Sequence, residues 1–204
     1  MPNLPVLDYS FFTETTKKAK YLIDGMRIDD SETADHSYGV NRLTLVLAEQ
    51  IPYLHQREIA CLHWGTILHD IGKIGISSSV LHKREPLTVQ EFAVIKNHPV
   101  WGYRMARLMD MPEDITDIIL YHHERYDGKG YPSGRKGKDS PLLARICTVV
   151  DAFHAMRTDR PYRNKLTYDQ AFQELEDNRG TQFDPDIVDF ILELAPIIKA
   201  GDIC

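Results

Sequence analysis

Histidines and aspartates recur along this chain at positions that suit ligands of buried metal ions. Five imidazoles fall at the expected ends or on the inward faces of helices, and two carboxylates lie in apolar segments. The seven residues are His36, His69, Asp70, His98, His122, His123 and Asp151. An unpaired carboxylate in apolar surroundings is costly, and metal coordination removes that cost. A lone histidine is more often an ordinary core residue, so the hypothesis of a metal centre depends on the whole set.

The size and chemistry of this set indicate more than one metal ion. Five imidazoles with additional carboxylates exceed the four ligands of one tetrahedral zinc site. A mixed nitrogen and oxygen set favours iron or manganese over magnesium or calcium. Asp70 could bridge two ions, and two ions about 3.5–4 Å apart activate water and stabilise an in-line displacement at phosphorus. The set therefore predicts hydrolysis of a phosphoester.

Basic and aromatic residues near this set could hold an anionic substrate. Lys73 follows the His-Asp pair by one turn and could neutralise charge on a phosphate oxygen, although a solvated lysine is equally compatible with its spacing. Arg160 and Arg163 belong to the densest basic run and could each grip phosphate through two N–H groups, or form a solvated face. Tyr131 could stack on a base or only anchor its glycine-rich loop. The residues alone leave these alternatives open.

Helices must position these residues, because apolar side chains recur along the chain with a helical period. Over residues 31–50, Val40, Leu43 and Leu47 share one face, and Asp30 or Ser31 can cap the start. Further helices are predicted over 57–70, from the Thr88–Glu91 capping box, at or before Pro99, and after Pro112, Pro141, Thr167 and Asp184. Glycines and Pro132 break residues 127–140 into a surface loop. No segment predicts a strand, so the expected fold class is all-α.

Length and composition predict one compact domain over residues 1–204, with residues 1–29 as an N-terminal helical extension. With 204 residues, 43% of them hydrophobic, the chain can bury one sizeable core. No apolar run approaches the ~20 residues of a membrane helix, and the first residues lack the pattern of a signal peptide. We therefore expect a cytoplasmic protein, in which Cys61 and Cys147 are reduced, buried thiols. The net charge of -6 argues against broad binding of nucleic acid polymers.

Three motifs resemble the HD-GYP subfamily of HD-domain phosphohydrolases. They are HDIGKIGI at 69–76, HHERYDGKGYP at 122–132 and DRPYR at 159–163, and they occur in the family's order. The resemblance covers roughly residues 30–190, including GTQFDP at 180–185. It implies a helical HD-domain bundle with a glycine-rich GYP loop. It also implies a cyclic di-GMP phosphodiesterase that opens the ring to linear pGpG and, with a third metal ion, cuts further to GMP.

The resemblance also implies roles for individual residues. The family's metal ligands fall on the seven residues already named, and trinuclear members add a glutamate at the position of Glu32, one helical turn before His36. Two or three ions, iron or manganese, are therefore expected. Asp70 and Lys73 are expected to be catalytic. By the same transfer, the substrate-binding residues are Lys73, Tyr131, Arg160 and Arg163, with Tyr131 packed on a guanine.

Two departures from the family pattern keep other functions open. The family usually has aspartate where this chain has His154, and Pro-Asp where it has Ser77-Ser78. We expect the first exchange to slow the enzyme without abolishing its activity. The alternatives are a phosphodiesterase for a cyclic GMP-AMP hybrid, a di-iron oxygenase, and a catalytically silent receptor whose GYP loop docks a diguanylate cyclase. Hydrolysis of cyclic di-GMP is the leading interpretation, and the oligomeric state is left open.

Replacing Arg160 with alanine is expected to weaken substrate binding while leaving the metal content unchanged. The reason is that its guanidinium is predicted to contact a ligand phosphate and not a metal ion. Steady-state kinetics and elemental analysis of the same preparation measure the two effects. An unchanged KM and rate would return Arg160 to the solvated face.

Overall fold

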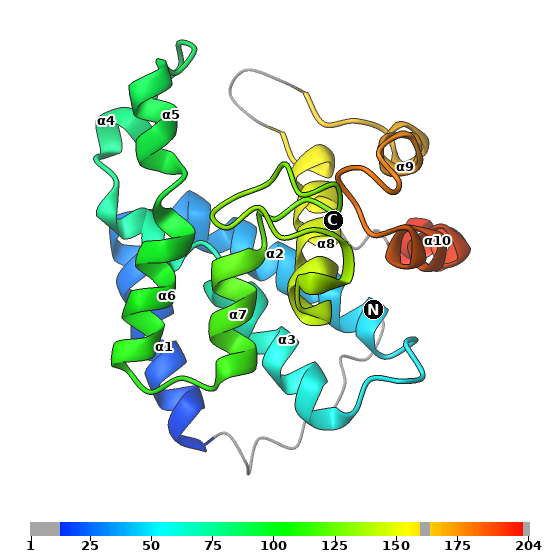
Figure 1. Cartoon of the computed structure of the whole chain (residues 1–204), viewed down its shortest axis with the longest axis horizontal. Coiled ribbons are helices and arrows are strands. Elements are labelled where there is room, and N and C mark those ends of the chain that lie inside the picture. The colour runs from blue at the N-terminus through cyan, green and yellow to red at the C-terminus, as the bar shows by residue number, and fades with distance from the viewer. Residues whose placement is uncertain (1–12, 160–163, 202–204) are drawn as a thin grey trace.

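The computed structural model describes residues 13–159 and 164–201, and helices are the only regular elements in these residues (Figure 1). The eleven α-helices are α1 (Thr13–Asp29), α2 (Ser31–Ala48), α3 (Gln56–Leu68), α4 (Ser78–Leu81), α5 (Val89–Ile95), α6 (His98–Leu108), α7 (Glu113–Tyr121), α8 (Leu142–Arg157), α9 (Tyr168–Asp177), α10 (Pro185–Glu193) and α11 (Ala195–Gly201). Two short 3₁₀ helices, η2 (Ile71–Gly75) and η3 (Gly137–Asp139), lie between them. The prediction of an all-α fold is confirmed.

Helices α2, α3 and α8 form the centre of the bundle. Helix α2 packs against α1, α3 and α8, and α3 packs in turn against α7. Fully buried side chains join these helices, among them Leu43, Leu62, Ile118 and Phe153. Burying one such side chain stabilises the fold by about 1.5–3 kcal/mol. The central helices therefore provide a rigid frame on which side chains at the helix ends can be held.

Helix starts follow the capping signals predicted from the sequence. Asp30 caps α2, where its side chain accepts hydrogen bonds from the backbone N–H groups of Glu32 and Thr33. At the start of α5, the Glu91 N–H donates to Thr88 Oγ1 over 3.2 Å and the Thr88 N–H donates to Glu91 Oε2 over 2.7 Å. This is the predicted capping box. A second capping box at Thr167 starts α9.

Helix ends place the candidate ligands at junctions. Helix α3 ends at Leu68, so His69 is its C-terminal cap and Asp70 lies just beyond, as the sequence predicted. Helix α6 begins at His98 with Pro99 in its first turn, which decides between the kink and the new start that the sequence allowed. The sequence did not predict η2 or α4, because segments this short carry no helical period.

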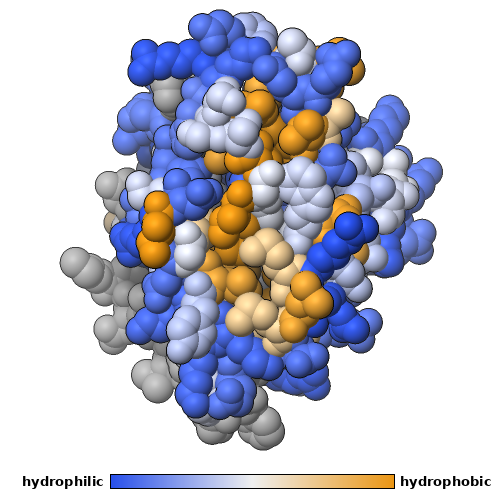
Figure 2. Space-filling model, turned by 90° about the vertical axis from the view of Figure 1, so that its left-hand side faces the viewer, coloured by the Kyte–Doolittle hydropathy of each residue, from blue (hydrophilic) through white to orange (hydrophobic). Residues whose placement is uncertain are grey.

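The predicted N-terminal extension contributes α1, which packs on α2, α3 and η2. Its buried residues are Ala19, Ile23 and Met26. Seen from the side that carries α1, α5 and α6, apolar side chains form a band bordered by hydrophilic ones (Figure 2). Within the described ranges, no helix is both long and apolar enough to cross a membrane.

Gly72 brings the turn after the His-Asp pair into contact with the start of α6. A Cβ atom added at Gly72 would collide with the carbonyl oxygen of His98 and the backbone nitrogen of Gly102. A backbone cannot move aside as a flexible side chain can. The absence of a side chain at Gly72 therefore allows η2 and α6 to pack closely and brings Asp70 near His98.

Replacing Gly72 with alanine is expected to lower the free energy of unfolding by about 1–3 kcal/mol, because the added methyl group overpacks this backbone contact. Urea unfolding of the metal-free protein measures the change. Gly25 on α1 is the matched control, since a Cβ there meets nothing within 4 Å. A Gly72→Ala protein that unfolds at the same urea concentration as wild type would contradict this account of the contact.

Candidate metal centre

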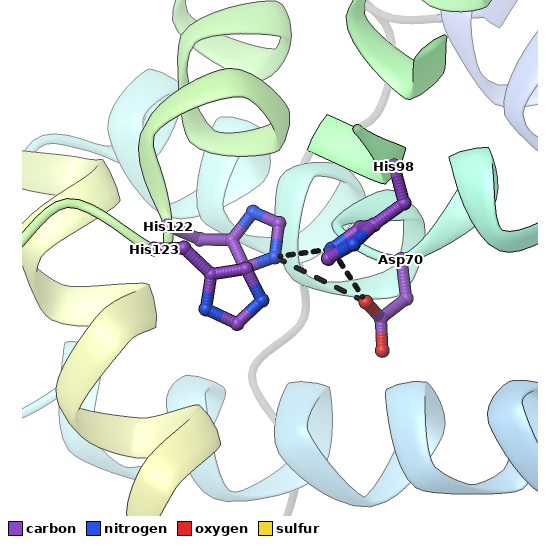
Figure 3. Close-up of side chains that lie close together, drawn as sticks. All are labelled: Asp70, His98, His122 and His123. Atoms are coloured by element: carbon purple, nitrogen blue, oxygen red, sulfur yellow. Dashed lines mark hydrogen bonds and ion pairs between the residues drawn. The ribbon is translucent and has the colours of Figure 1, made fainter. Parts of the chain in front are cut away.

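The seven ligand candidates predicted from the sequence form two adjacent clusters, in which His36 and Asp151 come from within α2 and α8 and the other five from the ends of α3, α6 and α7. In the first cluster, the side chains of Asp70, His98, His122 and His123 point toward one another (Figure 3). The second cluster consists of His36, His69 and Asp151. Within each cluster, one nitrogen or oxygen atom of every residue lies within 4.8 Å of the corresponding atoms of the others. The structure therefore brings all seven together.

Three of the imidazoles are oriented by the same hydrogen bond. The Nδ1 atoms of His69, His98 and His122 lie 2.7, 2.7 and 2.9 Å from the carbonyl oxygens of Thr66, Ile95 and Ile119. Each carbonyl belongs to the last turn of a helix, where carbonyl groups have no partner within the helix. A carbonyl oxygen only accepts, so each Nδ1 carries the proton and donates it.

Two rings held in this way turn their other nitrogens toward each other. His98 Nε2 and His122 Nε2 are 3.2 Å apart, and both are buried (Figure 3). With the proton on Nδ1, Nε2 of a neutral imidazole presents a lone pair. Two lone pairs at this distance favour a cation between or beside them. His69 Nε2 is likewise buried without a hydrogen bond among the described residues. These donors fit a transition-metal site.

Asp70 joins the two clusters through its two carboxylate oxygens. Oδ1 lies 3.2 Å from His98 Nε2 and 4.0 Å from His122 Nε2 in the first cluster. Oδ2 lies 3.3 Å from His69 Nε2 in the second. A carboxylate in this position is able to bridge two ions, so the bridging role expected of Asp70 is compatible with its place between the clusters.

Lys73 also contacts Asp70. Its Nζ donates to Asp70 Oδ2 over 2.6 Å, one turn along the chain. The Lys73 ammonium is therefore paired with a ligand candidate. The sequence alone had allowed either a phosphate contact or a solvated position for this lysine.

The pKa values of the buried groups follow from their charges. Burial raises the pKa of Asp70, but Lys73 and His69 outweigh it and hold that pKa well below its usual value. Burial lowers the pKa of His69, but the carboxylates of Asp70 and Asp151 raise it to about 9. The site therefore favours positive charge beside its two carboxylates. Burial also lowers the pKa of His123 to about 3, so that ring is a neutral donor.

Comparison with known proteins identifies the family of this chain. A family model described as HD domain matches residues 32–187, which is most of the chain and includes all seven ligand candidates. The chain belongs to the HD domain family. Its resemblance to the HD-GYP subfamily is confirmed by its relatives.

Curated relatives of this HD-domain chain are phosphodiesterases by name. It is 36% identical over 167 residues to a cyclic di-GMP phosphodiesterase of Thermotoga maritima, covering 81% of this chain and 45% of that protein. It is 33% identical over 189 residues to 3'3'-cGAMP-specific phosphodiesterase 2 of Vibrio cholerae, covering 88% of this chain and 35% of that protein. The chain thus spans less than half the length of these relatives.

A solved structure shares the HD-domain fold. Bd1817, an HDG"Y"P protein from Bdellovibrio bacteriovorus, superimposes with a TM-score of 0.68 at 18% sequence identity, covering 90% of this chain and 62% of that one. At this identity the likeness shows the fold alone.

The remaining predicted residues of the HD domain lie outside the two clusters. Glu32 is on α2 with His36 but is exposed and belongs to neither cluster. Tyr131 stacks on the ring of His123, with centroids 4.8 Å apart and an interplanar angle of 30°. One face of Tyr131 is therefore already in contact with a ligand candidate. Arg160 and Arg163 lie outside the described residues.

Sequence reasoning missed the backbone carbonyls that orient the imidazoles and a glycine beside His154. The carbonyls have no signature in the residue types, although histidine in the last turn of a helix is a known signal. The signal for Gly39 was its place inside the predicted helix of residues 31–50, where a glycine usually has a packing or functional reason. The sequence did predict that His154 projects toward the site. Its Nδ1 lies 3.1 Å from His36 Nδ1.

Replacing Asp70 with alanine is expected to remove bound metal, because this one carboxylate contacts both clusters. Any metal-dependent hydrolysis of a phosphodiester should then fall by roughly a hundredfold or more. Elemental analysis, circular dichroism and a turnover assay test this on one preparation. The helices should persist. Asp177→Ala, an exposed change on α9, is the control. Wild-type turnover in the Asp70 variant would overturn the assignment.

Proposed function

We propose that this HD domain is a metal-dependent phosphodiesterase that hydrolyses cyclic di-GMP to linear pGpG and, with a third metal ion, further to GMP. The observation that carries the proposal is the convergence of imidazole Nε2 atoms on both sides of Asp70. Buried lone pairs and carboxylates that face one another destabilise a purely structural core, because each is costly to desolvate without a partner. A site for cations, next to space for a substrate, resolves that cost.

A cavity beside the second cluster provides the space. It has a volume of about 680 Å³ and is lined by His36, Lys73, Glu32, Arg84 and Ile95, among others. Ligand pockets for molecules of this class are typically about 300–1,000 Å³. Because a ligand candidate and a lysine share its wall, a phosphodiester bound there would reach the metal centre while the rest of the substrate fills the cavity.

Different residues of the chain would hold the metal ions, bind the phosphate and contact the base. The metal ions, when bound, would activate water and stabilise the charge that develops on the phosphate. His36, His69, Asp70, His98, His122, His123 and Asp151 would hold them. Lys73 lies on Asp70 and at the cavity wall, where its ammonium would offset negative charge on a phosphate oxygen. Arg160 and Arg163 would bind phosphate, and Tyr131, whose ring stacks on His123 and has Lys96 Nζ 5.2 Å from its centroid, would pack on a guanine.

The proposed ions are iron or manganese, because the donor set mixes imidazole nitrogens with carboxylate oxygens. Two ions correspond to the two clusters. Glu32 lines the same cavity as His36, one turn away on α2, and would be the additional ligand of a third ion.

A cyclic GMP-AMP hybrid is the second candidate substrate. It is favoured by the relative from Vibrio cholerae, which is named as specific for 3'3'-cGAMP. The two substrates share the phosphodiester ring and differ in one base. The same metal centre would serve both substrates, so the preference between them would depend on the residues that contact the bases.

Purification under anaerobic conditions, followed by elemental analysis and by chromatography of products, tests metal and reaction together. At least two transition-metal ions per chain are expected, because the seven proposed ligands exceed what one ion accepts. Linear pGpG should form from cyclic di-GMP and disappear on treatment with a chelator. The hybrid substrate, run in parallel, reports the preference between the two.

Each other outcome is informative. One zinc ion or no metal would contradict the proposed centre. A full complement of metal with binding of cyclic di-GMP and no product would identify a receptor instead of an enzyme.

A further inference from the structure

His154 on α8 contacts the ligand candidate His36 directly. Their Nδ1 atoms are 3.1 Å apart, and their ring centroids are 5.0 Å apart. Both residues are buried, with exposed fractions of 6% and 9%. On its other side, His36 Nε2 faces Asp151 Oδ1 over 2.8 Å. One nitrogen of His36 therefore points into the second cluster and the other points at His154.

This arrangement repeats, with a different partner, the hydrogen bond that orients three other imidazoles of the site. There a backbone carbonyl accepts the Nδ1 proton and leaves Nε2 free. His36 lies within α2, and the partner of its Nδ1 is an imidazole. For His36 Nε2 to act as a ligand, His36 Nδ1 must carry the proton, so His154 Nδ1 accepts it.

Gly39 makes room for His154 in this position. A Cβ atom added at Gly39 would collide with Nε2 and Cε1 of the His154 ring. The backbone at Gly39 does not need glycine, because its φ is not among the positive values of the described residues. A glycine inside a helix lowers helix stability relative to alanine. Space for the imidazole is the local feature that explains it.

We propose that His154 is a positioning residue for His36, and that Gly39 provides the space in which the His154 imidazole lies. This inference rests on the proposed metal centre, since it assigns how one ligand of that centre is held. It gives a physical role to the residue that departs from the family pattern. It also predicts that substitutions at positions 39 and 154 do not act independently on metal binding.

Titration of the metal-free protein with Mn²⁺ alone tests the positioning role of His154 without relying on turnover. Electron paramagnetic resonance or calorimetry would resolve the sites, and His36→Ala identifies the one that contains His36. His154→Leu fills the space without an acceptor and should weaken Mn²⁺ binding at that site by roughly 10- to 100-fold. His154→Asn places an amide oxygen near the Nδ1 position and should keep the affinity within about threefold of wild type.

The glycine is tested by a double-mutant cycle. Gly39→Ala alone should weaken the same site by roughly tenfold, because the methyl group displaces the His154 ring. In a His154→Ala background the space is vacant, so Gly39→Ala should cause no further loss. Gly25→Ala, which has open space around it, is the control and should bind as wild type does. Thermal unfolding of the metal-free variants verifies that each is folded.

Three results would overturn the inference. They are wild-type affinity in both His154→Leu and Gly39→Ala, equal losses in the Leu and Asn variants, and additive losses in the cycle. In each of these cases wild-type protein still binds Mn²⁺, and the proposed function stands. Absence of Mn²⁺ binding by wild type would instead overturn the metal centre and this inference with it.

Discussion

The last carbonyl groups of an α-helix have no partner within the helix, and this chain uses three of them to orient histidine side chains. The acceptors are on Thr66, Ile95 and Ile119, each three residues before the histidine that donates to it. One hydrogen bond satisfies an otherwise free carbonyl and also decides which imidazole nitrogen faces inward. Because these helix ends lie close together, the Nε2 atoms of His69, His98 and His122 are turned toward the same region of the interior.

Charge completes what these hydrogen bonds begin. Asp70 and Asp151 are held as carboxylates in the interior, where an isolated negative charge is costly. Lys73 compensates part of that charge from the cavity side, and His69 takes up a proton readily because it lies between the two carboxylates. The same negative charge that favours the proton would favour a metal ion. A metal-binding role for this centre is therefore consistent with both its hydrogen bonds and its charges.

Two glycines determine how closely the residues of the two clusters approach their neighbours. Gly72 lets the turn that carries Asp70 touch the backbone of His98, and Gly39 leaves space for the ring that contacts His36. Neither glycine has the positive φ that would require it for backbone reasons. Both act through the volume they leave empty. Gly39 thus leaves the space that the ring of His154 occupies beside His36.

The sequence by itself determined the helical architecture, the capping residues and the identity of the seven ligand candidates. Helical periodicity and the capping boxes at Thr88 and Thr167 are local signals, set by residues a few positions apart. Short elements such as η2 and α4 escaped prediction because they have too few residues to show a period. Only the tertiary structure decided that the ligands divide into two clusters joined by Asp70.

Contacts between distant segments were equally beyond reach of the sequence. Tyr131 packs one face on His123, and His154 lies against His36 across 118 residues of chain. The reason is physical: the direction of a side chain at a helix end depends on which carbonyl, ring or empty space another helix presents to it. The sequence specifies residue types along one dimension, whereas these partners are selected by how the helices pack.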